Sequence, residues 1–432
     1  MATPIPVNEA CFTADEIVRA TGARTTFEGD TCGVCLDSRL VEPGNLFVAL
    51  RGEVHDAHRY VPQAFERGAA AVLVDREPAA ADAKTFVVDD ALRALGALAG
   101  AHRRRLDRLD VVGVTGSVGK TTTKELIAAA LRGTGRATLA TRGNLNNRIG
   151  VPMTLLSLDE SHDAAVIEMG MSEPGEIAAL AAMAAPRIGV VTSVAEVHTA
   201  GVDGIDGVAR EKGALLAALP EDGVAIWNAD DVAIGACGEA SRARRKISYG
   251  RSEGAALRVT VAAVNEDGTY CRFTLGERQL VAELRLLGSH AASNAGAALA
   301  VVAALDEAHI EEAAKALGGV APMPQRMVPI WLPSGTLLID DSYNASPRST
   351  LAALTTCAAI AALKGTGLIA VLGDMLELGA REYALHEEVG REAVRLGAKA
   401  LVVCGERMSH AGREALSATM AAPGGRRTKI VI

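Results

Sequence analysis

The spacing of apolar residues changes along the chain and separates stretches of different character. Residues 1–90 carry short apolar runs between turn residues and one helical stretch, which predicts a small α/β unit. From residue 110, strand-length apolar runs alternate with amphipathic stretches of helical length. This alternation predicts a parallel sheet covered by helices on both faces. The predicted strands are 110–116, 164–170, 188–194 and 223–228, and the predicted helices are 173–183 and 204–219.

The pattern then changes twice more. Residues 255–287 have the pattern of short strands joined by turns, and a helix is predicted at 289–305. Prolines mark 318–329 as a linker, beyond which strands and helices alternate again. A chain of 432 residues is also too long for one ordinary core. We therefore predict three α/β domains, which are a small domain at 1–90, a central parallel-sheet domain at 91–322 and a Rossmann-like domain at 323–432.

The segment TGSVGKT at 115–121 joins a predicted strand to a predicted helix. Its glycines permit a tight curl in which backbone N–H groups and the helix dipole hold an anion. Lys120 would contact the β- and γ-phosphates of a nucleoside triphosphate, and the Thr121 hydroxyl would face Mg²⁺. The strict phosphate-loop pattern has glycine where this chain has Val114, and the alternative is an ordinary glycine turn. The predicted nucleotide-binding residues of this loop are Thr115, Gly116, Ser117, Val118, Gly119, Lys120, Thr121 and Thr122.

Three further residues are candidates for handling the γ-phosphate. Glu168 ends a predicted strand on the same sheet edge as the loop, where a second metal ligand is expected. His198 follows the strand at 188–194, and Lys212 lies in the helix at 204–219. Taken singly, each has an ordinary alternative as a surface residue.

Composition narrows the class of protein. The net charge is −8, the isoelectric point is about 5.7 and aromatic residues make up 3% of the chain, without a basic stripe. These values disfavour nucleic-acid binding. We see no signal-peptide pattern, and no apolar window reaches the ~20 residues that span a bilayer. We expect a cytoplasmic monomer.

The seven cysteines are scattered, and only Cys32 and Cys35 form a C-x-x-C pair. No second pair is present to complete a zinc site. We therefore expect reduced thiols.

These segments together resemble the Mur ligase family, the ATP-dependent amino-acid and peptide ligases of peptidoglycan synthesis. TGSVGKTTTKE at 115–125 is similar to the family's ATP loop, and GNLNNRIGVPMTLL at 143–156 to its Asn-rich segment. AVIEMGMSEPGEI at 165–177 resembles the segment that carries its metal-binding glutamate. IDDSYNASP at 339–347 and LGDMLELG at 372–379 are similar to motifs of the member that takes UDP-N-acetylmuramoyl-tripeptide and D-alanyl-D-alanine.

The resemblance implies roles for individual residues. Lys120, Glu168, His198 and Lys212 would be catalytic. Thr121, Glu168, His198 and, if carbamylated, Lys212 would hold metal. Residues implied to bind ATP outside the loop are Asn294, Arg326 and Asp341. Residues implied to bind the other substrates are Asp37, Ser38, Arg39, Asn146, Asn147 and Asn344, of which the first three lie in a domain for the UDP end.

The resemblance also implies the reaction. ATP would phosphorylate a substrate carboxylate, and the amine of the dipeptide would displace phosphate from the acyl phosphate, with Mg²⁺ as cofactor. Two positions differ from the family's usual asparagine, namely Ser193 and Ala291. The family's closing motif is absent at the C-terminal end. The alternatives are that the third domain lacks its last strand and helix, or that the sequence diverges from the family after about residue 420. The alternatives are a sister or folylpolyglutamate-type ligase and an ATP-binding module without catalysis.

Overall fold

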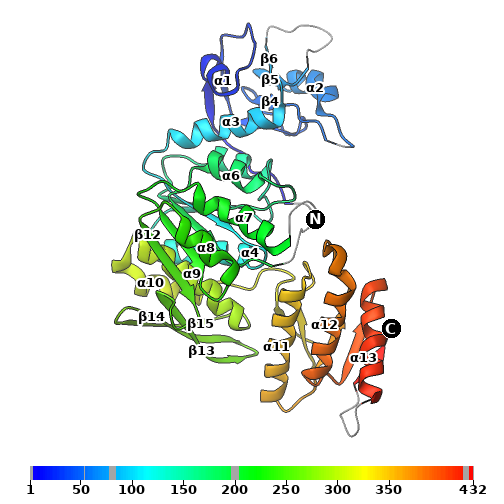
Figure 1. The fold of residues 1–432 in the computed structure, drawn as a ribbon. Coiled ribbons are helices and arrows are strands. Elements are labelled where there is room, and N and C mark those ends of the chain that lie inside the picture. The colour runs from blue at the N-terminus through cyan, green and yellow to red at the C-terminus, as the bar shows by residue number, and fades with distance from the viewer. Residues whose placement is uncertain (1–2, 53, 77–83, 196–203, 422–427, 432) are drawn as a thin grey trace.

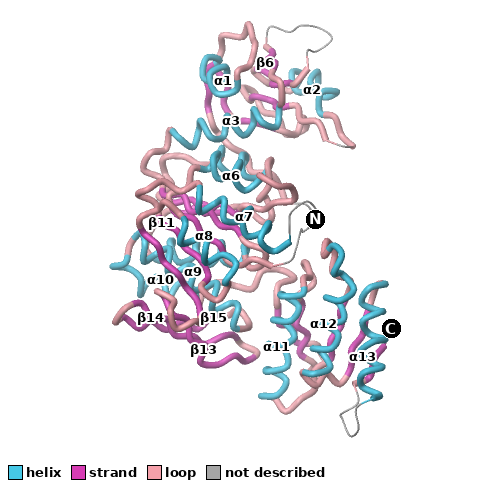
Figure 2. Tube along the Cα trace, viewed as in Figure 1, coloured by secondary structure: helices cyan, strands magenta, loops and turns pink. Residues whose placement is uncertain are grey.

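The computed structural model describes residues 3–52, 54–76, 84–195, 204–421 and 428–431. It has three α/β parts in chain order, with the N-terminal part at one end and the C-terminal part beside the lower end of the central part (Figure 1). Loops join most strands to the helices that follow them (Figure 2). No helix within the described residues is both long and apolar enough to cross a bilayer.

The N-terminal part has a four-stranded parallel sheet in the order β3-β4-β5-β6 and a two-stranded antiparallel ladder, β1-β2. Helix α1 begins at a capping box in which Thr13 and Glu16 exchange hydrogen bonds. The strands are β1 Cys11–Thr13, β2 Asp30–Cys32, β3 Val34–Cys35, β4 Leu46–Val48, β5 Ala71–Val74 and β6 Thr85–Val87. The helices are α1 Ala14–Thr21, η1 Ala57–Tyr60 and α2 Val61–Glu66.

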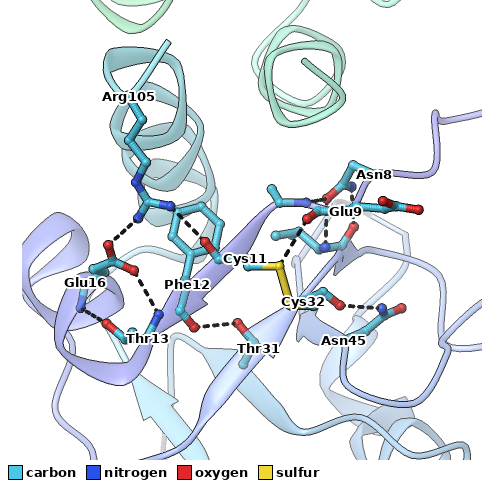
Figure 3. The surroundings of a disulfide bond; sticks show 12 residues. Asn8, Glu9, Cys11, Phe12, Thr13, Glu16, Thr31, Cys32, Asn45 and Arg105 are labelled. Carbon is cyan, nitrogen blue, oxygen red and sulfur yellow. Dashed lines mark hydrogen bonds and ion pairs between the residues drawn. A yellow bond between two sulfur atoms is a disulfide. The ribbon is translucent and has the colours of Figure 1, made fainter. Parts of the chain in front are cut away.

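Helix α3 (Ala91–Arg104) connects this part to the centre of the molecule. It contacts α1 on one side and α5 and α6 on the other. Just beyond its last residue, Arg105 donates to the Cys11 carbonyl (2.8 Å), pairs with Glu16 (2.9 Å) and stacks over the Phe12 ring (4.8 Å), as Figure 3 shows. One guanidinium therefore fastens the end of α3 to β1 and α1.

The expectation that all cysteines are reduced is wrong for Cys11 and Cys32, which form a disulfide (Figure 3). The register of the β1-β2 ladder places these two residues directly opposite each other. Cys35, the other member of the C-x-x-C pair, has a free thiol. Cross-strand pairing depends on register, which the cysteine spacing does not reveal.

The central part is built on a nine-stranded sheet in the order β15-β14-β13-β12-β11-β10-β7-β9-β8. Strands β7 to β12 pair in parallel, and β13 to β15 form an antiparallel meander at one edge, as the sequence pattern predicts. The parallel strands are β7 Asp110–Thr115, β8 Thr138–Ala140, β9 Ala164–Glu168, β10 Ile188–Val191, β11 Val224–Asn228 and β12 Arg245–Gly250. The meander strands are β13 Leu257–Asn265, β14 Gly268–Leu275 and β15 Arg278–Leu284.

Helices cover both faces of this sheet. Alternate residues of β7, Val112 and Val114 on one face and Val111 on the other, enter different cores. Helices α4, α9 and α10 pack on the first face, and α5 to α8 on the second. Their bounds are α4 Lys120–Gly133, α5 Gly150–Leu156, α6 Glu176–Ala184, α7 Gly204–Ala217, α8 Val232–Ala240, α9 Ser289–Leu305, η2 Glu307–His309 and α10 Ile310–Leu317. The predicted two-sided α/β sheet is confirmed.

The C-terminal part has a hairpin, β16-β17, and a parallel sheet in the order β18-β19-β20. Helix α11 starts at Pro347, directly after a capping Ser346. The strands are β16 Val328–Trp331, β17 Leu337–Asp340, β18 Ile369–Leu372, β19 Ala400–Val403 and β20 Lys429–Val431. The helices are α11 Pro347–Leu363, η3 Gly379–Arg381, α12 Glu382–Arg395 and α13 Glu406–Ala421.

The central and C-terminal parts meet along α11. Leu287, Met327 and Ile360 form a small buried cluster between α11 and the central part. Beyond the C-terminal end of α11, Lys364 pairs with Glu266 in the turn between β13 and β14. The domain limits at 90 and 322 stay predictions, as does a missing last strand.

Candidate active site

The phosphate-loop candidate has the conformation that an anion site requires. It leaves β7 at Thr115 and enters α4 at Lys120, with φ of 151° at Gly116 and 87° at Gly119. A Cβ on Gly116 would lie 2.0 Å from the Thr192 hydroxyl, so no other residue fits there. The loop passes close to its neighbours at both glycines.

The residues after β10 support this loop from outside. The backbone N–H groups of Ser117 and Val118 donate to the Ser193 carbonyl (2.8 Å) and to its hydroxyl (3.0 Å). The Thr192 hydroxyl donates to the Val118 carbonyl at 2.6 Å. Ser193, noted above only as a departure from asparagine, therefore fixes the shape of the loop.

Lys120 is turned toward its own loop. Its Nζ donates to the carbonyl oxygens of Gly116 (2.7 Å) and Ser117 (3.3 Å). Burial lowers the pKa of Lys120, Glu168 nearby opposes that shift, and Arg326 adds to it. The side chain is placed where the phosphates of a nucleotide would offer oxygens in exchange for these carbonyls.

Glu168 ends β9 beside the loop, with only 1% of its surface exposed. Its Oε1 accepts hydrogen bonds from the Thr121 hydroxyl (3.2 Å) and the Asn146 amide (2.8 Å). Its Oε2 is buried and has no hydrogen-bond partner among the described residues. A buried carboxylate oxygen without a partner, next to a threonine hydroxyl, fits a divalent cation such as Mg²⁺.

Protein ligands for that cation are few in the part of the chain that the structure describes. There, no group of three or more His, Cys, Asp and Glu side chains is arranged to hold a metal ion. The predicted ligand His198 lies outside the described residues. Thr121 and Glu168 would therefore share the ion with non-protein oxygens, as Mg²⁺ sites with nucleotides commonly do.

Lys212 is buried in α7, with 2% of its surface exposed. Burial lowers its pKa to about 7, repulsion from Lys120 adds to the shift, and Glu211 opposes it. Much of this amine is therefore neutral at neutral pH, the state in which it is a nucleophile.

Three residues at the far side of the loop come from distant segments. The Asn294 amide on α9 lies so close to Gly119 that a Cβ there would be 2.9 Å from its Oδ1. Arg326 donates to the Thr121 hydroxyl (3.2 Å) and stacks over the Tyr343 ring at 4.1 Å. Asp341 accepts from the Met327 N–H (3.1 Å), and burial raises its pKa to about 6 although Arg326 opposes the shift.

Most of these residues line one cavity of about 470 Å³, with walls from the central and C-terminal parts. The predicted residues that line it are Ser117, Val118, Gly119, Lys120, Thr121, Thr122, Asn146, Glu168, Asn294, Arg326, Asp341 and Asn344. Lining residues that the sequence analysis did not predict as site residues include Thr192, Ser193, Asn228, Arg251, His290, Tyr343 and Arg348. Burial lowers the pKa of His290 to about 4, so its ring is neutral.

Several predicted residues lie elsewhere. Thr115 and Gly116 shape the loop from behind, and the Asn147 side chain accepts the N–H groups of Ile149 (3.1 Å) and Gly150 (2.9 Å) at the start of α5. Their predicted binding roles stay predictions.

The predicted UDP-side residues form a separate group in the N-terminal part. Arg39 holds the Asp37 carboxylate with two nitrogens (2.9 and 2.6 Å), which lowers the pKa of Asp37. The Ser38 hydroxyl donates to Gln63 at 2.7 Å. These residues lie outside the cavity lining.

A phosphate loop, a buried carboxylate and a cavity shared between two α/β parts define the class of nucleotide-dependent enzymes whose site lies between two domains. Comparisons with known proteins identify the family. The Mur ligase middle domain matches residues 114–302, the Mur ligase glutamate ligase domain matches 325–431, and the Mur ligase family catalytic domain matches 31–103. The chain belongs to the Mur ligase family.

Similar proteins cover nearly the whole chain. The UDP-N-acetylmuramoyl-tripeptide–D-alanyl-D-alanine ligase of Bacillus subtilis is 39% identical over 380 residues, which are 87% of this chain and 80% of that protein. A crystal structure of MurF from Acinetobacter baumannii matches with a TM-score of 0.86 and 30% identity over 98% of this chain and 96% of that one. MurF from Thermotoga maritima in complex with ADP matches with a TM-score of 0.78 and 26% identity over 92% of both chains.

Proposed function

We propose that this chain is an ATP-dependent ligase that joins D-alanyl-D-alanine to UDP-N-acetylmuramoyl-tripeptide, giving the UDP-linked pentapeptide for peptidoglycan synthesis. The observation that carries the proposal is the cavity where Lys120, Thr121 and the unpartnered oxygen of Glu168 face residues of the C-terminal part. Relatives at 36–39% identity carry the name of this ligase, and a MurF structure contains ADP.

The chemistry begins with a carboxylate, which is a poor electrophile because it is negatively charged and lacks a leaving group. Transfer of the γ-phosphoryl group from ATP forms an acyl phosphate and releases ADP. The amine of the dipeptide then attacks the acyl carbon, a tetrahedral intermediate collapses, and phosphate leaves as the amide bond forms. The energy of the ATP anhydride is thereby used to make an amide.

The residues of the loop act by positioning and electrostatics. Two unit charges at 4 Å repel by ~4 kcal/mol at an effective dielectric of ~20, so the meeting of carboxylate and γ-phosphate needs cations. Lys120 would leave its loop carbonyls for the phosphate oxygens. Ser193 and Thr192 fix the shape of the loop, and its N–H groups that do not donate to Ser193 would hold the nucleotide. No side-chain nucleophile is required.

Mg²⁺ is part of the proposal. Thr121 and Glu168 would hold it, and a bound divalent cation neutralises phosphate charge during transfer. Lys212 would provide a ligand for a second Mg²⁺. Its partly neutral amine can take up CO₂ and become a carbamate, which is an anionic group beside Lys120. His198 stays a predicted ligand.

The remaining assignments follow from the same reaction. Asp341 is proposed at the ribose, Asn294 and Arg326 at the adenine and phosphate side, and Asn344 where the dipeptide enters. Asp37 to Arg39 are proposed at the UDP end. We also place the reaction in the cytoplasm, where ATP and nucleotide-linked sugars are used, and expect a monomer.

Phosphate release tests the proposal. ATP, Mg²⁺ and UDP-N-acetylmuramoyl-tripeptide should give rapid release only when D-alanyl-D-alanine is added, with the UDP-pentapeptide as product. Lys120→Ala should lower the rate at least 100-fold, whereas Lys315→Ala, an exposed lysine of α10 outside the cavity, should leave it unchanged. Release with single amino acids in place of the dipeptide would indicate a sister ligase. ADP binding without any release would indicate a binding module.

A further inference from the structure

Arg348, the second residue of α11, crosses from the C-terminal part to the central part. Its Nη1 donates to the Asp231 carboxylate at 2.6 Å and to the Val194 carbonyl at 2.9 Å. Asp231 is buried, with 5% of its side chain exposed, whereas 43% of the Arg348 side chain is exposed and the residue lines the cavity. One guanidinium nitrogen thus spans the junction between the two parts.

Asp231 has a second task at the same point. The oxygen that accepts from Arg348 also accepts the Val194 N–H at 2.8 Å. Both backbone groups of Val194 are therefore held by this ion pair, the N–H by Asp231 and the carbonyl by Arg348. The position of Val194 depends on two side chains from different parts of the molecule.

Val194 directly follows the residue that shapes the phosphate loop. Ser193 accepts the N–H groups of Ser117 and Val118, as described above. On its other side, Ala195 donates to the Ser117 hydroxyl at 2.9 Å. A continuous set of hydrogen bonds therefore runs from Arg348 through residues 193–195 to the loop.

We propose that Arg348 is a positioning residue that couples the placement of the C-terminal part to the shape of the phosphate loop, with Asp231 as its fixed partner. The inference rests on the proposed ligase function. In that reaction the acyl phosphate forms at the loop, while the attacking amine arrives from the side of α11. The Arg348–Asp231 pair therefore orders the phosphate loop when the C-terminal part is docked on the central part.

The alternative role for Arg348 is direct recognition of the dipeptide carboxylate, since its side chain faces the cavity. The two roles differ in what Asp231 does. A positioning pair acts as a unit, so removing either partner removes the same function. An arginine that binds the dipeptide carboxylate would affect only the binding of the dipeptide. The effects of removing Arg348 and of removing Asp231 would then be additive in the double variant.

The test uses the full-length variants Arg348→Gln, Asp231→Asn, the double variant and Arg348→Lys. Arg391→Gln is the control, because Arg391 pairs with Glu387 within α12 and lies away from the cavity. We measure kcat and the KM for ATP and for D-alanyl-D-alanine, and ADP affinity by calorimetry. Thermal unfolding checks that each variant is folded.

We expect each single variant to lower kcat at least 10-fold and ADP affinity at least 3-fold, with the KM for the dipeptide changed less than 3-fold. The kcat and ADP affinity of the double variant should be no lower than those of the less active single variant. Arg348→Lys should have a higher kcat than Arg348→Gln, and the control should match the parent chain. Additive losses, or a loss confined to the dipeptide KM, would overturn the proposal in favour of carboxylate recognition. Unchanged kcat and ADP affinity would overturn it as well.

Failure of the ligase function itself would be seen separately. The parent chain and Arg391→Gln would then show no dipeptide-dependent phosphate release. ADP affinity still tests the coupling in that case, because it needs neither the dipeptide nor turnover. Non-additive losses of ADP affinity support the link between Arg348 and the loop, and equal affinities in all variants reject it.

Discussion

Lys212 and Lys120 share a buried region in which two like charges are costly. Burial lowers the pKa of both side chains, and each proposed ligand in the reaction, phosphate, Mg²⁺ or a carbamate, changes the charge balance around them. The Glu168 carboxylate, whose Oε2 has no hydrogen-bond partner among the described residues, places a buried negative charge near Lys120. These buried charges are unfavourable in the free protein, and we expect bound ligands of the opposite charge to stabilise them.

The low pKa of Lys212 predicts a pH-dependent effect on stability. Its pKa is about 7 in the folded chain and near 10.5 when unfolded, so the unfolded state binds the extra proton between these values. The cost of burying the charge is complete below pH 7 and disappears as the pH rises toward 10.5. Lys212→Met should therefore raise the free energy of unfolding by roughly 5 kcal/mol at pH 6 and by roughly 2 kcal/mol at pH 9.

Urea unfolding at the two pH values measures this difference. Lys315→Met, at an exposed position on α10, is the control and should shift neither midpoint. An equal effect of Lys212→Met at pH 6 and pH 9 would show that packing rather than charge sets the stability at this position.

A second prediction concerns Gly116, where a Cβ would meet the Thr192 hydroxyl. Gly116→Ala should push the loop away from β10 and weaken ADP binding at least 10-fold. Gly135→Ala is matched, because Gly135 also has positive φ (86°) but open space around it. That variant should cost only about 1 kcal/mol of backbone strain and leave ADP affinity unchanged. Calorimetric titration with ADP compares the two, and equal affinities would argue against a tight loop.

Only some of the residues that line this site could be predicted from the sequence. Lys120, Thr121 and Glu168 could be predicted, because a local motif and the edge of a parallel sheet place them. Thr192 and Arg348 could not, since their partners lie 74 and 117 or more residues away and their residue types are ordinary at the surface.

At the scale of elements, helices and strands could be predicted where the pattern of apolar residues extended over a long segment. The helix predicted at 289–305 agrees with α9 at both ends, and Gly288 marks its start. Strands β8 and β12 were not predicted. They are half-buried or exposed along most of their length, so they lack the apolar run by which β7, β9 and β10 could be recognised.

The Cys11–Cys32 disulfide gives a prediction for the β1-β2 ladder. It closes a loop with a sequence separation of 21, and closing such a loop in the unfolded chain is worth ~3 kcal/mol. Reduction with dithiothreitol, or Cys11→Ser, should therefore lower the melting temperature of the N-terminal part. Cys404→Ser, at an exposed free cysteine, should not. Equal melting with and without reductant would mean that the ladder and the contacts of Arg105 hold this region without the bond.

Over the whole molecule, the sequence predicted the class of fold but not how its parts meet. The junction along α11 combines the buried cluster around Ile360, the Arg348–Asp231 pair and the Lys364–Glu266 pair. Each joins residues more than 70 positions apart, and such contacts leave no mark in the spacing of apolar residues. The cavity is lined from both sides of this junction, so a closure around substrates would shift the two parts relative to each other.

Trp331 is placed to report that movement. The chain has two tryptophans, of which Trp227 is buried in β11 and Trp331 is 53% exposed in β16, with Lys364 5.2 Å from its ring. Because Lys364 also holds Glu266 across the junction, a shift of the C-terminal part changes the charge beside the Trp331 ring. In Trp227→Phe we expect the emission of Trp331 to change when ATP, the UDP-substrate and the dipeptide are all bound, and Trp331→Phe should lose this change. Constant Trp331 emission while product forms would mean that α11 stays fixed on the β13-β14 turn, and closure would then have to come from the N-terminal part.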